Sequence, residues 1–208
     1  MKNLIIVGAG GMGRTLYDMA CESAGYKTKF LIKGFLDDNL QALKGFENYP
    51  PLLGSITDYQ PKTDEVFVCS MGGDVKKKCI ELILEKGGEF WSLVHNTARI
   101  GTNVQLGIGN IVGAYTSIGA DATIGNYNLI QSYSIIGHDV IVGNWNRIDT
   151  HVVCVGGTKV GDEVSIHTAA VLNHKVTVGN RSCVGANSFV IRSVKEGITV
   201  FGNPAKQI

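Results

Sequence analysis

Proline and charge of either sign are scarce in this 208-residue sequence. Only 18% of the residues are charged, the formal net charge is +1, and there are four prolines. A nearly neutral chain lacks the basic surface that general nucleic-acid binding requires, so any anion site must come from local groups. Because 44% of the residues are hydrophobic, we expect a folded protein with a sizeable core.

Long apolar runs and paired cysteines are also missing. No segment approaches the roughly 20 apolar residues that a membrane span needs. The N-terminal segment MKNLIIVGAGGMG has too short an apolar stretch and no cleavage pattern typical of a signal peptide. The five cysteines contain no CxxC pair, which favours free buried thiols in a reducing compartment. We therefore expect a cytoplasmic protein.

Glycine, in contrast, is abundant, with 27 residues and no collagen period, and this bias indicates internal repeats. From Ile100 to Val190, every sixth residue is aliphatic, apart from Cys154. A glycine often follows this position, and a small residue, a β-branched residue or Asn often stands two places before it. A period of six fits neither a helix, with 3.6 residues per turn, nor an alternating strand.

A short strand followed by a turn explains this period. Three such units can close a triangular coil, in which each inward side chain stacks on its equivalent at a strand spacing of about 4.8 Å. We expect Gly and Asn at the corner turns, where they would supply positive φ angles. One six-residue unit cannot bury its own aliphatic residue, so neighbouring coils must stabilise one another. Cys154 occupies an inward position and is expected to fill the core rather than react.

Residues 1–95 lack this period and predict a small α/β domain of Rossmann-like type. The segment LIIVGAGGMG reads as a strand and a GxGxxG turn that opens a helix, where a pyrophosphate could approach the backbone. A second strand ends at Asp37 and Asp38, which either accept ribose hydroxyls or are ordinary exposed turn carboxylates.

The rest of this domain predicts a strand at DEVFVCS, a helix at MGGDVKKKCIELILEKGG and a last strand at EFWSLVH. Lys76, Lys77 and Lys78 are expected on a solvated face of that helix. The domain is shorter than a full dinucleotide-binding domain, which favours a mononucleotide or a nucleotide sugar over NAD. Residues 96–208 then form the parallel β-helix and a C-terminal tail.

His138 and Asp139, in IGHDVIVG, are the candidate catalytic pair. A neutral imidazole can take a proton from an amine or hydroxyl, and a carboxylate beside it raises its basicity and fixes its tautomer. Adjacent strand residues face opposite sides, so the pair can form only if a turn bends the chain between them. The alternative is an exposed corner histidine beside an exposed aspartate, without a function.

The Rossmann-like front, the hexapeptide repeat, IGHDVIVG and the terminal GNPAK together resemble the sialic-acid O-acetyltransferase and UDP-bacillosamine N-acetyltransferase family. This resemblance spans nearly the whole chain. It implies a left-handed β-helix, a homotrimer, and acetyl-CoA-dependent N-acetylation of a nucleotide-linked amino sugar, a UDP-4-amino sugar for surface glycans. It also implies that His138 is the general base, that Asp139 is its partner, and that no metal is needed.

The same resemblance assigns binding residues. The nucleotide part of the substrate maps to Gly10, Gly11, Met12, Asp37 and Asp38. The acetyl-CoA groove between subunits maps to Arg147, Gly156, Thr168 and Ala186, with the N–H of Gly156 placed to hold the thioester oxygen. Met12 and Arg147 stand where the bacillosamine branch often has histidine, and Arg147 is a permanent cation that could meet a phosphate.

Other functions remain open from the sequence. The acceptor could be a sugar hydroxyl, as in sialic-acid or capsule O-acetylation, or the chain could be a non-catalytic nucleotide-binding β-helix protein. A zinc hydratase on this fold needs neutral histidine ligands, but His167 and His174 are seven residues apart and no HxxxxH occurs. A nicotinamide oxidoreductase would need a second substrate domain, which the sequence does not contain.

Overall fold

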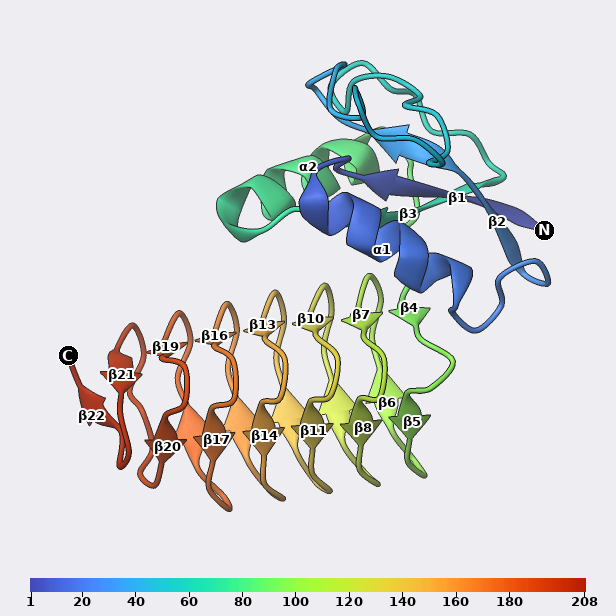
Figure 1. Cartoon of the computed structure of the whole chain (residues 1–208). Coiled ribbons are helices and arrows are strands. Elements are labelled where there is room, and N and C mark those ends of the chain that lie inside the picture. Colours follow the sequence, from blue (N-terminus) through green and yellow to red (C-terminus); the bar gives the residue numbers. More distant parts are fainter. The chain divides into compact units, whose positions relative to one another are not determined.

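The computed structural model describes residues 1–208, which form two compact units, Met1–Leu93 and Val94–Ile208 (Figure 1). No helix in either unit has the length and apolar character needed to cross a membrane. The first unit combines helices with a small sheet, and the second consists of very short strands.

The front unit is an α/β domain built on a three-stranded parallel sheet. β1 (Lys2–Val7) lies between β2 (Phe30–Leu36) and β3 (Glu65–Cys69). Helix α1 (Gly11–Cys21) follows β1, and α2 (Gly73–Glu85) follows β3. The last four residues of β1 and all five of β3 are buried, which is typical of parallel strands covered on both faces. The predicted strands and helices at these positions are confirmed.

Two expectations for this domain need correction. The segment EFWSLVH contains a strand that begins the repeat, Leu93–Val94, but it adds no fourth strand to the front sheet, which Phe90 meets only through an isolated bridge to Phe67. Lys76 is buried and Lys78 exposed, so the lysine run is not a uniformly solvated face. Burial lowers the pKa of Lys76, because the charged ammonium is less stable away from water.

The second unit is a parallel β-helix of two-residue strands. Partner strands are 18 residues apart, as in the pairing of Ile130 with Ile148, so three strands make one turn of the coil. Their bounds are β4 (Leu93–Val94), β5 (Arg99–Ile100), β6 (Gln105–Leu106), β7 (Ile111–Val112), β8 (Ser117–Ile118), β9 (Thr123–Ile124), β10 (Leu129–Ile130), β11 (Ile135–Ile136), β12 (Ile141–Val142), β13 (Arg147–Ile148), β14 (Val153–Cys154), β15 (Lys159–Val160), β16 (Ser165–Ile166), β17 (Val171–Leu172), β18 (Thr177–Val178), β19 (Cys183–Val184), β20 (Phe189–Val190), β21 (Thr199–Phe201) and β22 (Lys206–Gln207).

The strands stack into three sheets, which are the three sides of the coil. We call β4, β7, β10, β13, β16 and β19 the first face; β21 and β22 extend it. The second face is β5, β8, β11, β14, β17 and β20, and the third face is β6, β9, β12, β15 and β18. All strand pairs are parallel except β21 with β22 at the C-terminal end.

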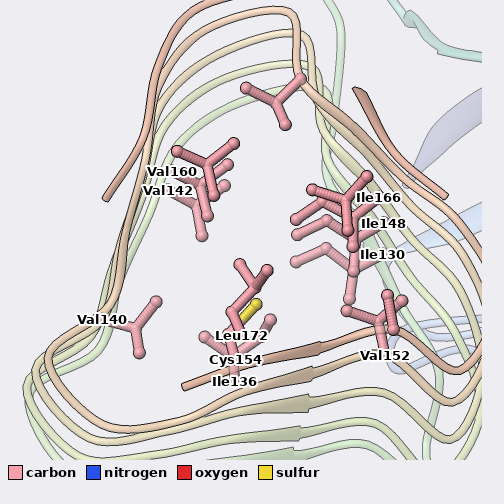
Figure 2. Close-up of a cluster of buried hydrophobic side chains, with 14 of the residues drawn as sticks. Ile130, Ile136, Val140, Val142, Ile148, Val152, Cys154, Val160, Ile166 and Leu172 are labelled. Carbon is pink, nitrogen blue, oxygen red and sulfur yellow. The ribbon is translucent and has the colours of Figure 1, made fainter. Parts of the chain in front are cut away.

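The inward positions of the repeat form the predicted core. Fourteen of the sixteen, from Val112 to Val190, are buried. Figure 2 shows their columns, with one residue from each successive coil stacked on the next. The exceptions, Ile100 and Leu106, lie on the first turn of the coil, which has no preceding turn to cover them. Cys154 lies within the core, where burial raises the pKa of its thiol to about 12, so it is inert as predicted.

The corner turns obtain their positive φ angles differently from our expectation. Every sixth residue from Asn103 to Asn187 has a φ between 55° and 71°, and only two of these fifteen residues are glycine. The glycines that follow the inward residues have ordinary φ angles. A Cβ on Gly119 would lie 2.6 Å from the backbone nitrogen of His138 in the next coil. Glycine at these positions therefore permits close approach between coils, and the left-handed turns lie two residues later.

Asparagine residues at one corner have a role that we did not expect. Their side chains form hydrogen bonds between successive coils. Asn126 and Asn144, at the corner between the third and first faces, each accept a backbone N–H from the coil before, at 2.9 Å. Asn110 and Asn128, on the inner side of the same corner, each accept one from the coil after, at 2.8 Å. The second ladder satisfies the N–H groups of Asn128 and Asn146, which would otherwise be buried without a partner.

Replacing an inward residue should destabilise the coil far more than replacing an outward one. Ile148→Ala is expected to lower the free energy of unfolding by about 2–5 kcal/mol, because the packed columns cannot close over the lost volume. Ile141→Ala removes the same atoms from a side chain that is 46% exposed, and a change below about 0.5 kcal/mol is expected. Denaturant unfolding measures both, and equal effects would contradict the inward assignment.

Candidate functional site

His138 and Asp139 form the pair that the sequence predicts, at the corner between the second and third faces. Asp139 has a φ of 57°, so a left-handed turn bends the chain as the pair requires. Oδ2 of Asp139 lies 2.6 Å from Nδ1 of His138. Because a carboxylate only accepts, Nδ1 carries the proton and Nε2 of the neutral ring keeps its lone pair. Both side chains are 65% exposed, so the pair lies on the surface of the coil.

Gly156 lies one coil further on, against the imidazole of His138. A Cβ at this position would lie 2.5 Å from Nε2 and 2.8 Å from Cε1 of the ring, so only glycine leaves room for it. Gly156 is buried and its N–H makes no hydrogen bond within the chain, whereas the next N–H, of Gly157, donates to the carbonyl of His138 at 2.9 Å. A basic nitrogen and an unused N–H donor are therefore neighbours.

The other residues assigned to acetyl-CoA lie elsewhere on the coil. Thr168 and Ala186 occupy equivalent positions of successive coils, at the corner between the first and second faces. Arg147 is an exposed residue of β13, on the first face. The second face lies between the corner of Thr168 and Ala186 and the corner of His138, and Arg147 lies beyond it on the first face. The six residues that cross the second face span at most about 20 Å. One chain thus holds the predicted set as two groups.

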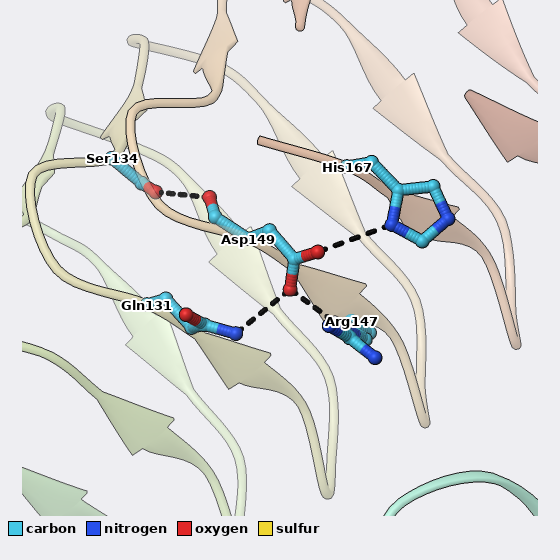
Figure 3. Close-up of polar contacts among 5 residues, drawn as sticks. All are labelled: Gln131, Ser134, Arg147, Asp149 and His167. Carbon is cyan, nitrogen blue, oxygen red and sulfur yellow. Dashed lines mark hydrogen bonds and ion pairs between the residues drawn. The ribbon is translucent and has the colours of Figure 1, made fainter. Parts of the chain in front are cut away.

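Asp149 belongs to no sequence motif, but it gathers several side chains from three coils (Figure 3). Its carboxylate accepts hydrogen bonds from Arg147, Gln131 and His167. Gln131, Asp149 and His167 are 18 residues apart in turn, which is one turn of the coil for each step. Arranging the sequence in rows of 18 would have shown this column.

The glycine-rich turn lies between β1 and α1. Gly10 caps the helix without a side-chain bond, and Gly11 and Met12 begin it, all three exposed. A Cβ on Gly13 would collide with the carbonyl of Gly8, so this glycine allows the helix to pack closely on the strand. The first-turn N–H groups of α1 point out of the helix and are suited to an anion.

Asp37 and Asp38 both make hydrogen bonds within the front domain. Oδ2 of Asp37 accepts the N–H of Ala9 at 2.8 Å, which ties the end of β2 to the glycine-rich turn, and Oδ1 accepts the N–H of Asn39 at 2.9 Å. Oδ1 of Asp38 accepts the N–H of Ile56 at 2.9 Å. These are the contacts of turn carboxylates, although each group keeps lone pairs for a further donor.

The remaining histidines have separate surroundings. His95 is buried, and its Nδ1 accepts the N–H of Thr97 at 3.1 Å, which is a structural contact. His151 stacks on Tyr133, with ring centroids 5.1 Å apart, and His174 is exposed. No group of three or more His, Cys, Asp or Glu side chains is placed to hold a metal ion.

Comparison with known proteins finds a family model for the front unit and similar structures for the whole chain. Residues 3–82, in the front domain, match the family model of the PglD N-terminal domain. No curated protein matches the chain. Among solved structures, WeeI from Acinetobacter baumannii AYE is similar with a TM-score of 0.88 at 24% sequence identity, over 100% of both chains.

Two further structures share the fold of the whole chain. The acetyltransferase domain of PglB from Neisseria gonorrhoeae FA1090 has a TM-score of 0.89 at 24% identity, over 100% of both chains. PerB from Caulobacter crescentus, solved with CoA and GDP-perosamine, has a TM-score of 0.87 at 22% identity, over 100% of this chain and 98% of PerB. The predicted fold class, a Rossmann-like domain before a hexapeptide β-helix, is confirmed. In fold, the whole chain is therefore similar to these three proteins.

Gly156→Ala should displace the imidazole of His138 while the coil stays folded. The added methyl would collide with the end of a side chain that can rotate, so we expect the ring to leave Asp139 with little loss of thermal stability. The ring signals of His138 in NMR spectra would report this movement. Gly10→Ala, whose Cβ would meet no atom within 4 Å, is the control. Unchanged His138 signals in Gly156→Ala would show that the ring does not lie on this glycine.

Proposed function

We propose that this protein is an acetyl-CoA-dependent N-acetyltransferase that acts on a nucleotide-linked amino sugar, with His138 as the general base. One observation carries the proposal: the exposed side chain of an Asp-paired histidine lies against Gly156, whose N–H makes no hydrogen bond within the chain. It is supported by the fold, since the PglB domain was solved with acetyl coenzyme A and PerB with CoA and GDP-perosamine.

The chemistry is a direct transfer. Nε2 of His138 accepts a proton from the substrate amine while the amine nitrogen bonds to the thioester carbon. The N–H of Gly156 donates to the oxygen on which negative charge develops in the tetrahedral intermediate. The carbon–sulfur bond then breaks, the thiolate of CoA leaves, and the proton on His138 is available to it. Asp139 holds the ring and stabilises the imidazolium that forms between these steps. No covalent acyl-enzyme is required.

The front domain is proposed to bind the nucleotide part of the substrate. The first-turn N–H groups at Gly10, Gly11 and Met12 would donate to the diphosphate, in agreement with the positive end of the helix dipole. Asp37 and Asp38 would accept ribose hydroxyls with the lone pairs that their turn contacts leave. We favour UDP as the nucleotide, and a 4-amino sugar for surface glycan synthesis as the acceptor.

A homotrimer is proposed to complete the acetyl-CoA groove. One chain separates His138 and Gly156 from Arg147, Thr168 and Ala186, so a groove lined by all five needs a second copy. Cyclic assembly brings different corners of identical subunits together. Tyr115 and Tyr133, at the corner between the first and second faces, and Ile135, on the second face, are exposed apolar residues. They are suited to such an interface. The five free cysteines agree with a reducing, cytoplasmic location.

Loss of the proposed base should abolish most of the activity. His138→Ala is expected to lower kcat by about 10²–10⁴ without changing the fold or the assembly, because the imidazole is exposed and only the proton acceptor is lost. His174→Ala, at the same corner two coils away, is the control and should retain activity. Turnover of a UDP-amino sugar with acetyl-CoA measures both, and unchanged kcat in His138→Ala would remove the residue from this role.

A ligand panel tests the substrate class. UDP-, GDP- and dTDP-linked amino sugars are each added with and without acetyl-CoA, and the melting temperature is recorded. A ligand that binds only the native state adds about 2.7 kcal/mol of stability at a hundred times its Kd. We expect acetyl-CoA and the UDP sugar to raise the melting temperature. A larger shift with GDP or dTDP sugars would correct the nucleotide, and no shift with any nucleotide sugar would contradict the proposed substrate. Hydroxyl acceptors added to the panel test O-acetylation.

A further inference from the structure

The carboxylate of Asp149 is enclosed by donors from three coils. Its side chain is only 6% exposed. Oδ1 accepts hydrogen bonds from Nε of Arg147 and from Nε2 of Gln131, both at 2.7 Å, and Oδ2 lies 3.1 Å from Nδ1 of His167. The hydroxyl of Ser134 donates to the backbone carbonyl of Asp149 at 2.9 Å, which fixes the backbone beneath the carboxylate. Figure 3 shows all five residues around one point.

This arrangement uses one edge of the Arg147 guanidinium and leaves the other open. Only Nε contacts Asp149, while Nη1 and Nη2 have no partner in the chain, and the side chain is 56% exposed. A free arginine loses about 2 kcal/mol of rotamer entropy when a ligand orders it. Because Asp149 already holds Nε, much of the rotamer entropy of Arg147 is lost on folding, before any ligand binds. The two outer nitrogens, Nη1 and Nη2, are therefore held in a fixed orientation.

A fixed guanidinium fork of this kind is suited to a phosphate group, which it can meet with two parallel hydrogen bonds. His167 directly precedes Thr168, so the cluster adjoins the group of residues assigned to acetyl-CoA at the corner between the first and second faces. Arg99, the outward residue of β5 on the second face, has no carboxylate partner. Arg181 pairs with Glu196, but through Nη2 and with a carboxylate whose side chain is 53% exposed. Arg147 differs from both in that its Nε is held by a buried carboxylate.

We propose that Asp149, buttressed by Gln131 and His167, is a positioning residue that holds the guanidinium of Arg147 to bind a phosphate group of a substrate. The inference rests on the proposed function, which supplies two phosphate-bearing substrates, CoA and the nucleotide sugar. Asp149 does not touch the ligand. Its effect passes through Arg147, so removing either residue should weaken the same interaction.

The test is binding, measured by calorimetry, of CoA, S-acetylpantetheine and UDP to the full-length protein. S-acetylpantetheine shares the thioester arm of the donor and has no phosphate. Asp149→Asn and Arg147→Gln are each expected to weaken CoA binding about 10- to 100-fold, the loss of one hydrogen bond to a charged group, and to leave S-acetylpantetheine unaffected. The double variant should bind CoA no more weakly than Arg147→Gln alone, because the two residues act in series.

The matched controls are Asp121→Asn and Arg99→Gln, an exposed carboxylate and an exposed outward arginine on the first two turns of the β-helix, which should bind CoA normally. Arg147→Lys keeps the charge on an exposed residue and loses the fork, so it folds and should bind CoA nearly as weakly as Arg147→Gln. If UDP affinity falls while CoA affinity does not, the phosphate that Arg147 meets belongs to the nucleotide sugar.

Several results would overturn the inference. Wild-type affinity for CoA and UDP in Asp149→Asn or in Arg147→Lys would show that the position of the guanidinium does not matter. Equal losses for CoA and S-acetylpantetheine in Asp149→Asn would show a structural role only. A wild-type protein that binds neither CoA nor UDP would instead remove the proposed function itself, an outcome that differs from loss in the variants alone.

Discussion

The stacking of one inward aliphatic side chain on the next, every 18 residues, is the interaction on which the coil depends. A two-residue strand has almost no stability of its own, and a single coil cannot bury its aliphatic residues. The column of Ile130, Ile148 and Ile166 therefore fixes the register of the whole first face. Once the inward set is fixed, the exposed outward positions and those corner positions that do not link successive coils are free to carry function.

The contact between His138 and Asp139 follows from the geometry of the corner. Fifteen successive turns place a left-handed residue at the same point of each hexad, and Asp139 occupies one of them. The reversal of the chain at this residue turns its carboxylate back onto the preceding His138, which a straight strand could not do. The coil also sets what lies beside the ring, because the residue 18 positions later is Gly156 and leaves the space that the imidazole fills.

The sequence predicts most of the fold because the repeat is strict. The inward set, the core role of Cys154 and the condition for the His138–Asp139 contact can all be read from a period of six. The source of the positive φ angles could not, because most left-handed corners hold Tyr, Asp, Glu, Lys or other non-glycine residues that the fold forces into this conformation. In the front domain no repeat provides a register, and the burial of Lys76 depends on how α2 packs.

Side-chain contacts between successive turns of the β-helix follow a period of 18 residues, three times the hexapeptide period of six. Gln131, Asp149 and His167 are unremarkable at a spacing of six but form one column at 18, and Arg147 joins them because it precedes Asp149 by two residues on the same face. The same period of 18 explains why the residues assigned to the groove form two separate groups on one chain. Positions 138 and 156 belong to one corner column and positions 168 and 186 to another, and no change of side-chain rotamer moves a residue between corners. A groove lined by both columns would need the corner of one subunit to face a different corner of the next, which is why the proposed site is one shared between subunits.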